Sequence, residues 1–169
     1  IYVTGNLGDS YLGLLVFQNK IKNKKFRNYF KNSFIEPKLP YKFSKTISKF
    51  ANSSMDISDG LIKDLKSLCF ASNCGAQFLF ESIPFSNQAI FLQKKKLIKL
   101  INIFSKGDDY QLLFTAKKKM RKKISMFAIK TQTKVTRIGI ITSKKDIIMS
   151  KGGKMLNLTA SKSGFIHSF

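Results

Sequence analysis

The chain has 169 residues, and its 31 Lys and Arg side chains against nine Asp and Glu give a formal net charge of +22. This length suffices for one domain with a hydrophobic core, and a hydrophobic content of 43%, with 12% aromatic residues, argues against a disordered chain. No apolar run approaches the roughly 18 residues that cross a membrane, and no signal peptide is recognisable.

The positive charge suggests nucleic-acid binding, but the kind of basic residue favours a solvated surface. Only Arg27, Arg121 and Arg137 are arginines, and the many lysines are spread along the chain. Recognition of bases and bidentate binding of phosphates use Arg, whereas Lys acts as a point charge. We therefore expect attraction for polyanions such as ATP and no specific nucleic acid. A basic nucleic-acid-binding module is the alternative from a different functional class.

The beginning of the chain predicts a strand, a glycine-rich turn and a helix. Residues 1–5 read as the strand, 6–10 as the turn, and Asp9 as the N-cap of an apolar helix over 11–17. The basic stretch 18–33 suits either a surface helix or a loop. Because the chain opens within a strand, we expect it to be part of a longer protein.

The central part predicts a strand that leads directly into a helix. A second helical pattern, over 43–50, precedes this unit and follows two prolines. We expect residues 54–57 to form a short buried strand and 58–60 a polar turn. Residues 61–73 are expected to form a helix whose leucines recur at i, i+4 and i+7 on one face.

The remaining chain continues to interleave the two kinds of element. We expect strands over 76–81, 110–115, 134–142 and 146–150, and helices within 86–103 and over 117–130. Lys144-Lys145 is expected to form a hairpin-like turn, and Gly152-Gly153 a further turn. Interleaved strands and helices predict the α/β or α+β class.

The strand-to-helix junction carries the strongest chemical pattern, Asp56-Ile57-Ser58-Asp59. A helix N-terminus that follows a strand offers backbone N–H groups and a favourable dipole to phosphate. Two carboxylates beside a phosphate repel it unless Mg²⁺ bridges them. We therefore predict a Mg²⁺–phosphate site. In the structural alternative Ser58 is an ordinary N-cap and Asp59 an ordinary first-turn acid, which leaves Asp56 unexplained.

The other motifs are weak by themselves. Gly107-Asp108-Asp109-Tyr110 is ordinary turn chemistry, and the turn at 5–8 lacks the Gly-Lys-Ser/Thr ending of a P-loop. Cys69 and Cys74 have neither metal-ligand spacing nor the context of a disulfide framework, so we expect buried thiols in a reducing cytoplasm. His167 is the one histidine, which excludes a site with several histidines.

Taken together, four motifs in the same order resemble the thiamine-monophosphate kinase family: Val3–Ser10, Met55–Leu61, Gly107–Phe114 and Gly164–His167. That family belongs to the aminoimidazole ribonucleotide synthetase-like superfamily. The resemblance implies a mixed sheet flanked by helices, with residues 1–169 as a single C-terminal domain of a two-domain kinase. A sister ATP-dependent enzyme of this superfamily is a further alternative.

The resemblance also implies an activity, which is ATP-dependent phosphorylation of thiamine monophosphate to thiamine diphosphate by direct in-line transfer with Mg²⁺. Asp56 and Asp59 would bind Mg²⁺ and Ser58 the nucleotide, whereas Asp108 and Phe165 would contact the substrate. The acceptor is a phosphate that is already ionised, so no strong general base is needed. Positioning and charge neutralisation then supply the catalysis.

The chain departs from the family pattern at three positions. Asp108 and Gln111 stand where the family usually has Glu, and Phe165 where it usually has Tyr. The N-terminal domain is absent, and in this family it carries most metal ligands and the strands that form a homodimer. We therefore predict that this chain alone is inactive as a kinase.

Overall fold

The strands form two separate sheets in this computed structural model, which describes residues 1–21 and 24–160. The first sheet has the order β2-β4-β1-β5 and is antiparallel throughout. Its strands are β1 (Tyr2–Thr4), β2 (Ala51–Ile57), β4 (Gln111–Ala116) and β5 (Val135–Arg137). The second sheet has the order β6-β3-β7-β8 and is mixed, because β3 and β7 run parallel. Its strands are β3 (Gly75–Leu79), β6 (Gly139–Thr142), β7 (Ile147–Lys151) and β8 (Lys154–Asn157).

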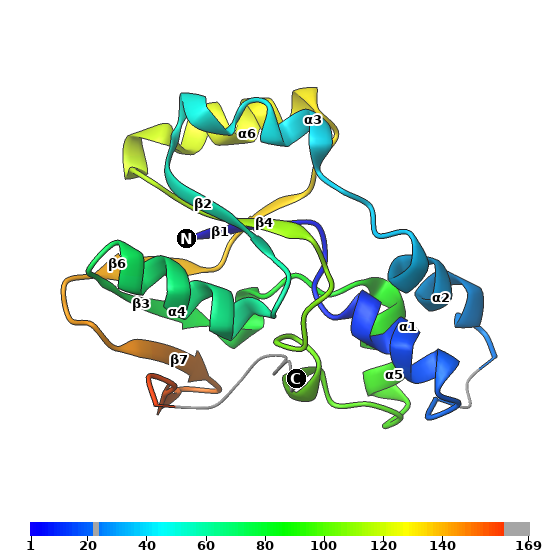
Figure 1. Ribbon diagram of the computed structural model, residues 1–169. Helices are drawn as coiled ribbons and strands as arrows, with labels where there is room; N and C mark the ends of the chain where they lie inside the picture. Colours follow the sequence, from blue (N-terminus) through cyan, green and yellow to red (C-terminus); the bar gives the residue numbers. More distant parts are fainter. Residues whose placement is uncertain (22–23, 161–169) are drawn as a thin grey trace, which may run out of the picture.

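The helices gather in three places around these sheets (Figure 1). Their bounds are α1 (Asp9–Phe17), α2 (Arg27–Ile35), α3 (Tyr41–Ser44), α4 (Leu61–Ala71), α5 (Asn87–Lys94) and α6 (Arg121–Lys130). Helices α3 and α6 lie together above the first sheet, α4 lies against both sheets, and α1, α2 and α5 form a group at one side. In the part of the chain that the structure describes, none of these helices has the length and apolarity of a membrane span.

Each helix group has its own apolar core. The largest core joins α4 to both sheets, and in it Leu61, Leu65 and Leu68 are buried as their spacing predicted. A second core lies among α1, α2 and α5. The third is aromatic and lies between the first sheet and helices α3 and α6, where Phe43, Phe50 and other rings contact one another. Burial of these three faces confirms the α/β class and the expected mixed sheet, to which the structure adds a second, antiparallel sheet.

Several element boundaries differ from those that the sequence predicted. The pattern over 43–50 yields α3 and a short 3-10 turn (Ile47–Lys49), because β2 already begins at Ala51. The basic stretch 18–33 becomes helical from Arg27. Short 3-10 turns also occupy Phe80–Ser82, Leu100–Asn102 and Lys118–Met120.

Two predictions about turns and caps are wrong. Lys144-Lys145 does not join a hairpin, because β3 lies between β6 and β7 and pairs with both. The expected strand over 134–142 is interrupted at Ile138 and contributes β5 to one sheet and β6 to the other. Asp9 is not an N-cap, because the cap is Gly8 and Asp9 is the first residue of α1. The Gly152-Gly153 turn is confirmed, as it joins the antiparallel pair β7 and β8.

Candidate metal and phosphate site

The two motifs that pair acidic residues meet at the end of the first sheet. Strands β2 and β4 are paired up to Ile57 and Gln111, and the chain before β4 continues this pairing. The amide of Tyr110 donates to the carbonyl of Ile57 at 2.9 Å, and the amide of Asp108 to the carbonyl of Ser58 at 2.9 Å. Sheet pairing thus brings together two motifs that are far apart in the sequence.

Two glycines permit this close approach of backbones. A Cβ atom at Gly107 would lie 2.4 Å from the carbonyl oxygen of Ser58, and one at Gly60 would lie 2.6 Å from the carbonyl of Ser105. Both glycines also have positive φ, +85° and +107° respectively. No other residue fits either position without displacing backbone.

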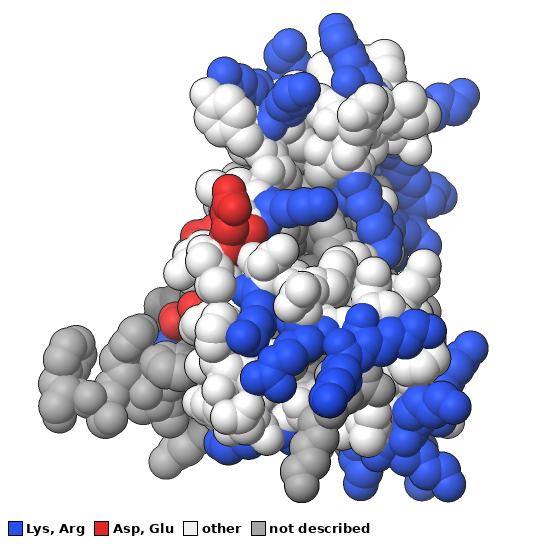
Figure 2. Space-filling model, turned by 90° about the vertical axis from the view of Figure 1, so that its right-hand side faces the viewer, with Lys and Arg blue, Asp and Glu red and all other residues white. Residues whose placement is uncertain are grey.

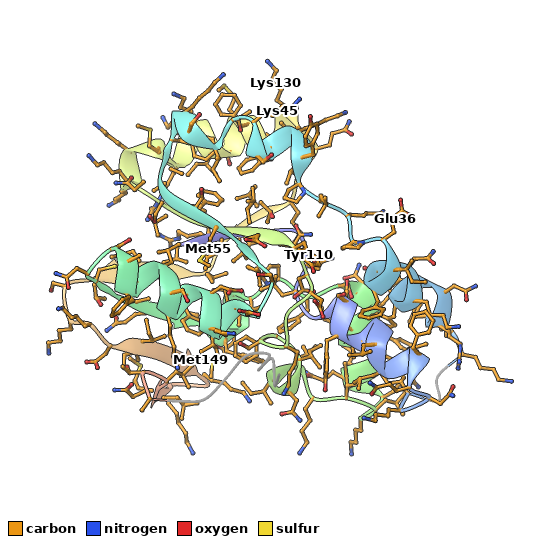
Figure 3. The ribbon with its side chains drawn as sticks, in the orientation of Figure 1. Glu36, Lys45, Met55, Tyr110, Lys130 and Met149 are labelled. Atoms are coloured by element: carbon orange, nitrogen blue, oxygen red, sulfur yellow. The ribbon has the colours of Figure 1, made fainter. Side chains whose placement is uncertain are left out.

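Backbone strain is concentrated in the same motif. Six described residues other than glycine have positive φ, and four of them, Asn19, Asn73, Lys96 and Gln132, follow the ends of helices. The other two are Asp108, with φ +60°, and Tyr110, with φ +50°. This conformation is unusual for a bulky side chain such as Tyr110 and often marks functional sites. Figure 3 shows Tyr110 at the centre of the molecule, where the first sheet approaches α1 and α2.

The predicted metal ligands lie at the β2–α4 junction and reach solvent. Asp56 is exposed at the end of β2, and the Asp59 side chain retains 30% of its accessible surface. One Asp59 oxygen lies 2.7 Å from the ammonium of Lys63, one turn into α4. Ser58 lies between the two acids and is half-buried. The three residues therefore share one accessible junction.

Three amides around the start of α4 already have acceptors, so fewer of them are free for phosphate than the sequence predicted. The carboxylate of Asp64 accepts hydrogen bonds from the amides of Asp59 (3.2 Å) and Gly60 (3.0 Å). The amide of Ile62 donates to the Ser105 hydroxyl at 2.9 Å. Burial, together with the charges of Asp59 and Asp56, raises the pKa of Asp64 to about 6. These three amides are therefore not available to an anion at this junction.

Asp109, which was predicted from its motif to be part of a turn, is a buried structural carboxylate. It is 5% exposed, and its two oxygens accept from the amide of Gly8 at 2.8 and 3.0 Å, with a further bond from the Ser10 amide. Burial raises the pKa of Asp109 to about 8. Asp109 thereby fastens the third motif to the start of α1. No local pattern in the sequence indicates this role, because Asp9 was predicted to cap the helix that begins after Gly8.

A polar cavity of about 380 Å³ opens beside the first motif and is lined by residues of α1, α2, the 37–40 segment and the α6–β5 turn. Here the buried carboxylate of Asp9 accepts from the Ser86 hydroxyl (2.6 Å) and the Tyr29 hydroxyl (2.7 Å). Burial raises the pKa of Asp9, and burial and Asp9 raise the pKa of Tyr29. These partners show that Asp9 is structural.

Gln111 also lines this cavity, and its contacts explain one departure from the family. Its amide nitrogen donates to the carbonyl of Lys38 at 2.9 Å, and its amide oxygen accepts from the Thr4 hydroxyl at 2.9 Å. A glutamate has no N–H donor for the Lys38 carbonyl. Gln111 is therefore matched to the local packing of this chain.

The donor set suits a magnesium ion that is shared with a phosphate. Mg²⁺ is commonly held by one or two protein carboxylates, with substrate phosphates and water completing its coordination. Asp56 and Asp59 provide two such carboxylates, and both act on the pKa of Asp64. Among the described residues no group of three or more His, Cys, Asp or Glu side chains is placed to hold a metal by itself. Phe165, the predicted substrate contact, lies outside the described residues.

The charge distribution sets this region apart. Figure 2 shows Lys and Arg side chains at the top, the right and the lower part of one face, with other residues between them, whereas Asp and Glu appear at its left edge. Six of the nine acidic residues belong to the two helix junctions and the motif that joins them: Asp9, Asp56, Asp59, Asp64, Asp108 and Asp109. Lysines dominate the rest of the surface, so acidic side chains are concentrated in this region among the described residues.

No protein-family model matches the chain. It is 37% identical over 171 aligned residues to the thiamine-monophosphate kinase of Buchnera aphidicola subsp. Schizaphis graminum, an alignment that covers 99% of this chain and 52% of that protein. The crystal structure of thiamine-monophosphate kinase from Stenotrophomonas maltophilia K279a has a TM-score of 0.77 at 25% identity, over 90% of this chain and 49% of that one. A solved structure of AaThiL complexed with AMPPCP and TMP has a TM-score of 0.76 at 30% identity, over 96% and 49%. The chain thus spans about half the length of the relatives it matches, and it belongs to the thiamine-monophosphate kinase family.

Proposed function

We propose that this chain provides the Mg²⁺- and nucleotide-binding part of a kinase that transfers a phosphoryl group from ATP to thiamine monophosphate. The observation that carries the proposal is the β2–α4 junction, where Asp56 and Asp59 reach solvent while Asp64 satisfies the neighbouring amides. Support comes from the relatives of that name and from the AaThiL complex, whose AMPPCP is an ATP analogue.

The residues would divide the work of binding. Asp56 and Asp59 would hold Mg²⁺, and the hydroxyl of Ser58 would donate to a nucleotide phosphate. When bound, the ion neutralises phosphate charge and supports in-line transfer. Asp108, held next to Ser58 by its backbone hydrogen bond, and Phe165 would contact thiamine monophosphate. The acceptor phosphate is ionised at neutral pH, so the site needs no general base.

We further propose that these residues act together with a second domain, equivalent to the half of the relatives that this chain does not cover. That domain would add further metal ligands and would form a homodimer. The chain alone would then form no measurable thiamine diphosphate. A cytoplasmic location likewise stays a prediction.

The experiment is a chimaera in which the uncovered half of the Buchnera aphidicola relative is fused to this chain. We expect formation of thiamine diphosphate from ATP and thiamine monophosphate, and a loss of about 100-fold or more in rate for Asp56→Asn and for Asp59→Asn. Asp146→Asn makes the same chemical change next to β7 in the second sheet and is the matched control.

Equal rates for the three variants would refute the proposed roles of Asp56 and Asp59. A second measurement addresses the alternative of a basic module. Duplex DNA binding that falls steeply with added salt, in a chimaera that transfers no phosphoryl group, would favour that alternative.

A further inference from the structure

The two cysteines of the chain occupy matched positions around the end of α4. Cys69 lies in the last turn and is 2% exposed, whereas Cys74 follows the helix and is half-buried. The amide of Cys74 donates to the carbonyl of Cys69 at 3.0 Å, and the amide of Asn73 to that of Phe70 at 3.1 Å. Asn73 has φ +50°. These two hydrogen bonds and the left-handed residue define a Schellman motif.

In a Schellman motif the side chains at the two ends of the longer hydrogen bond commonly contact each other. The end of α5 shows the same arrangement, with a bond from the Leu97 amide to the Leu92 carbonyl and Lys96 at φ +58°. There the paired side chains are two leucines. At α4 the equivalent pair is Cys69 and Cys74, so the backbone motif itself directs one thiol toward the other.

The surroundings of the thiols agree with this geometry. Both cysteine side chains line one cavity of about 370 Å³ between the end of α4 and the segment that joins β6 to β7. Lys66 and Lys145 line the same cavity. Burial, and then the charge of Cys74, raises the pKa of the Cys69 thiol to about 12. Cys74 is therefore the thiol that an oxidant reaches first.

We propose that Cys69 and Cys74 form a redox-sensitive pair that hydrogen peroxide closes to an intrachain disulfide. The Cys74 thiolate attacks one peroxide oxygen, the O–O bond breaks, and the sulfur becomes a sulfenic acid as hydroxide leaves. The Cys69 sulfur then attacks that of Cys74, an S–S bond forms, and water leaves with the proton of Cys69. In sum, two thiols are oxidised and one peroxide is reduced to two waters.

The pair is separate from the proposed metal site. Helix α4 has 11 residues, so its two ends lie about 16 Å apart at the usual rise per residue. Asp59 precedes one end and the thiols lie at the other. Disulfide formation would fix the C-terminal end of α4 without contacting the ligands of the kinase site. The inference therefore does not depend on the proposed function.

The test exposes the folded 169-residue chain to hydrogen peroxide, blocks the remaining thiols with N-ethylmaleimide in denaturant, and measures its mass. We expect a monomer that has lost two hydrogens and takes up no N-ethylmaleimide, and dithiothreitol should restore both thiols. Cys69→Ser should accumulate sulfenic acid at Cys74, which dimedone traps. Cys74→Ser should leave Cys69 reduced at the same dose.

Three results would overturn the proposal. The first is a wild-type chain in which both thiols remain reactive after peroxide treatment. The second is dimedone-trapped or over-oxidised Cys74 in place of a disulfide in that chain. The third is a disulfide between two chains, seen as a dimer on a non-reducing gel. The wild-type measurement decides the matter even if one of the serine variants does not fold.

Discussion

Two strand–turn–helix junctions in this molecule have similar designs and different accessibility. The β1–α1 and β2–α4 junctions each place a glycine with positive φ before the helix, Gly8 at +86° and Gly60 at +107°. At each junction a carboxylate accepts from amides at the helix start. At α1 this acid is Asp109, which comes from 101 residues away in the sequence. At α4 it is Asp64, which belongs to the helix itself.

The source of the carboxylate decides what remains available for a ligand. At α1 the remote acid occupies amides of the helix start, and Asp109 and Asp9 are both buried with protein partners, although both line the polar cavity beside the first motif. At α4 the local acid satisfies the amides from within, and Asp56 and Asp59 keep access to solvent. Acids that are paired in the sequence can therefore be either structural, like Asp9 and Asp109, or accessible to a ligand, like Asp56 and Asp59. Burial and hydrogen-bond partners separate the structural acids from those that can bind a cation.

The largest effect should come from removing the remote acid. We expect Asp109→Ala to lower the free energy of unfolding by about 3 kcal/mol, because buried amides at Gly8 and Ser10 lose their acceptor. Asp64→Ala should cost less, about 1.5 kcal/mol, because one of the two amides that it accepts from, that of Asp59, is only partly buried and donates at a longer 3.2 Å. Urea unfolding followed by circular dichroism measures both. An equal or larger loss for Asp64→Ala would contradict the comparison.

A glycine substitution tests how closely the two acidic motifs must approach. Gly107→Ala should cost about 2 kcal/mol or more, since it adds a clash with the Ser58 carbonyl to the left-handed strain. Gly152→Ala is the matched control, with φ +54° and no atom within 4 Å of the added Cβ. It should cost about 1 kcal/mol. Chemical denaturation distinguishes these values, and identical losses would show that the approach of the backbones is not restrictive.

The local parts of this comparison were predictable from sequence. The face of α4 follows from the spacing of Leu61, Leu65 and Leu68, and the junction around Asp56 and Asp59 follows from a strand that runs directly into that helix. The strand itself differs from the prediction, because β2 begins at Ala51 and exposes alternate residues, Asp56 among them, instead of being buried throughout. Both patterns lie within about twenty residues and depend on local periodicity. The family resemblance extended the same motifs to a binding role.

The long-range parts were not predictable in this way. Nothing near Asp109 in the sequence indicates that its partner is the Gly8 amide, and nothing near β6 indicates that β3 separates it from β7. Such pairings depend on which strand edges the whole chain leaves free. The capping role of Asp64 was predictable, because Asp64 lies four residues after Gly60, a spacing that lets its carboxylate reach the amides at the helix start.

The pH dependence of stability distinguishes the buried acid from the open junction. The pKa of Asp109 is raised from 3.8 to about 8 in the folded chain, so the folded state holds this proton more tightly than the unfolded state. The stabilisation that this proton gives to the folded state is fully present below the pKa of Asp109 in the unfolded chain. It is lost as the pH rises through the pKa of Asp109 in the folded chain. The slope for one carboxyl is at most about 1.4 kcal/mol per pH unit.

Asp109→Asn cannot titrate, so it should remove the pH-dependent stabilisation that Asp109 provides. Unfolding experiments between about pH 4 and pH 8 would show a flatter dependence of the free energy of unfolding on pH for the variant. The buried Ile1 amine, whose pKa is lowered to about 6, acts in the opposite sense at neutral pH. The Ile1 amine is present in both the wild-type chain and the Asp109→Asn variant, so its effect cancels when their stability profiles are subtracted. Parallel profiles for the two chains would contradict the assignment.

The smallest effect on stability should follow a change at the open junction. Asp59→Asn removes an exposed pair with Lys63, and we expect a change within about 0.5 kcal/mol in the free energy of unfolding. The same variant should lower the pKa of Asp64, because the Asp59 charge helps to raise it, and carboxyl NMR titration measures this shift. A fall in stability comparable to that of Asp109→Ala would identify Asp59 as another structural acid. Unchanged stability with a lower Asp64 pKa would instead show that the Asp59 carboxylate is accessible to solvent and repelled by a neighbouring carboxylate. These are the conditions that favour a bound cation.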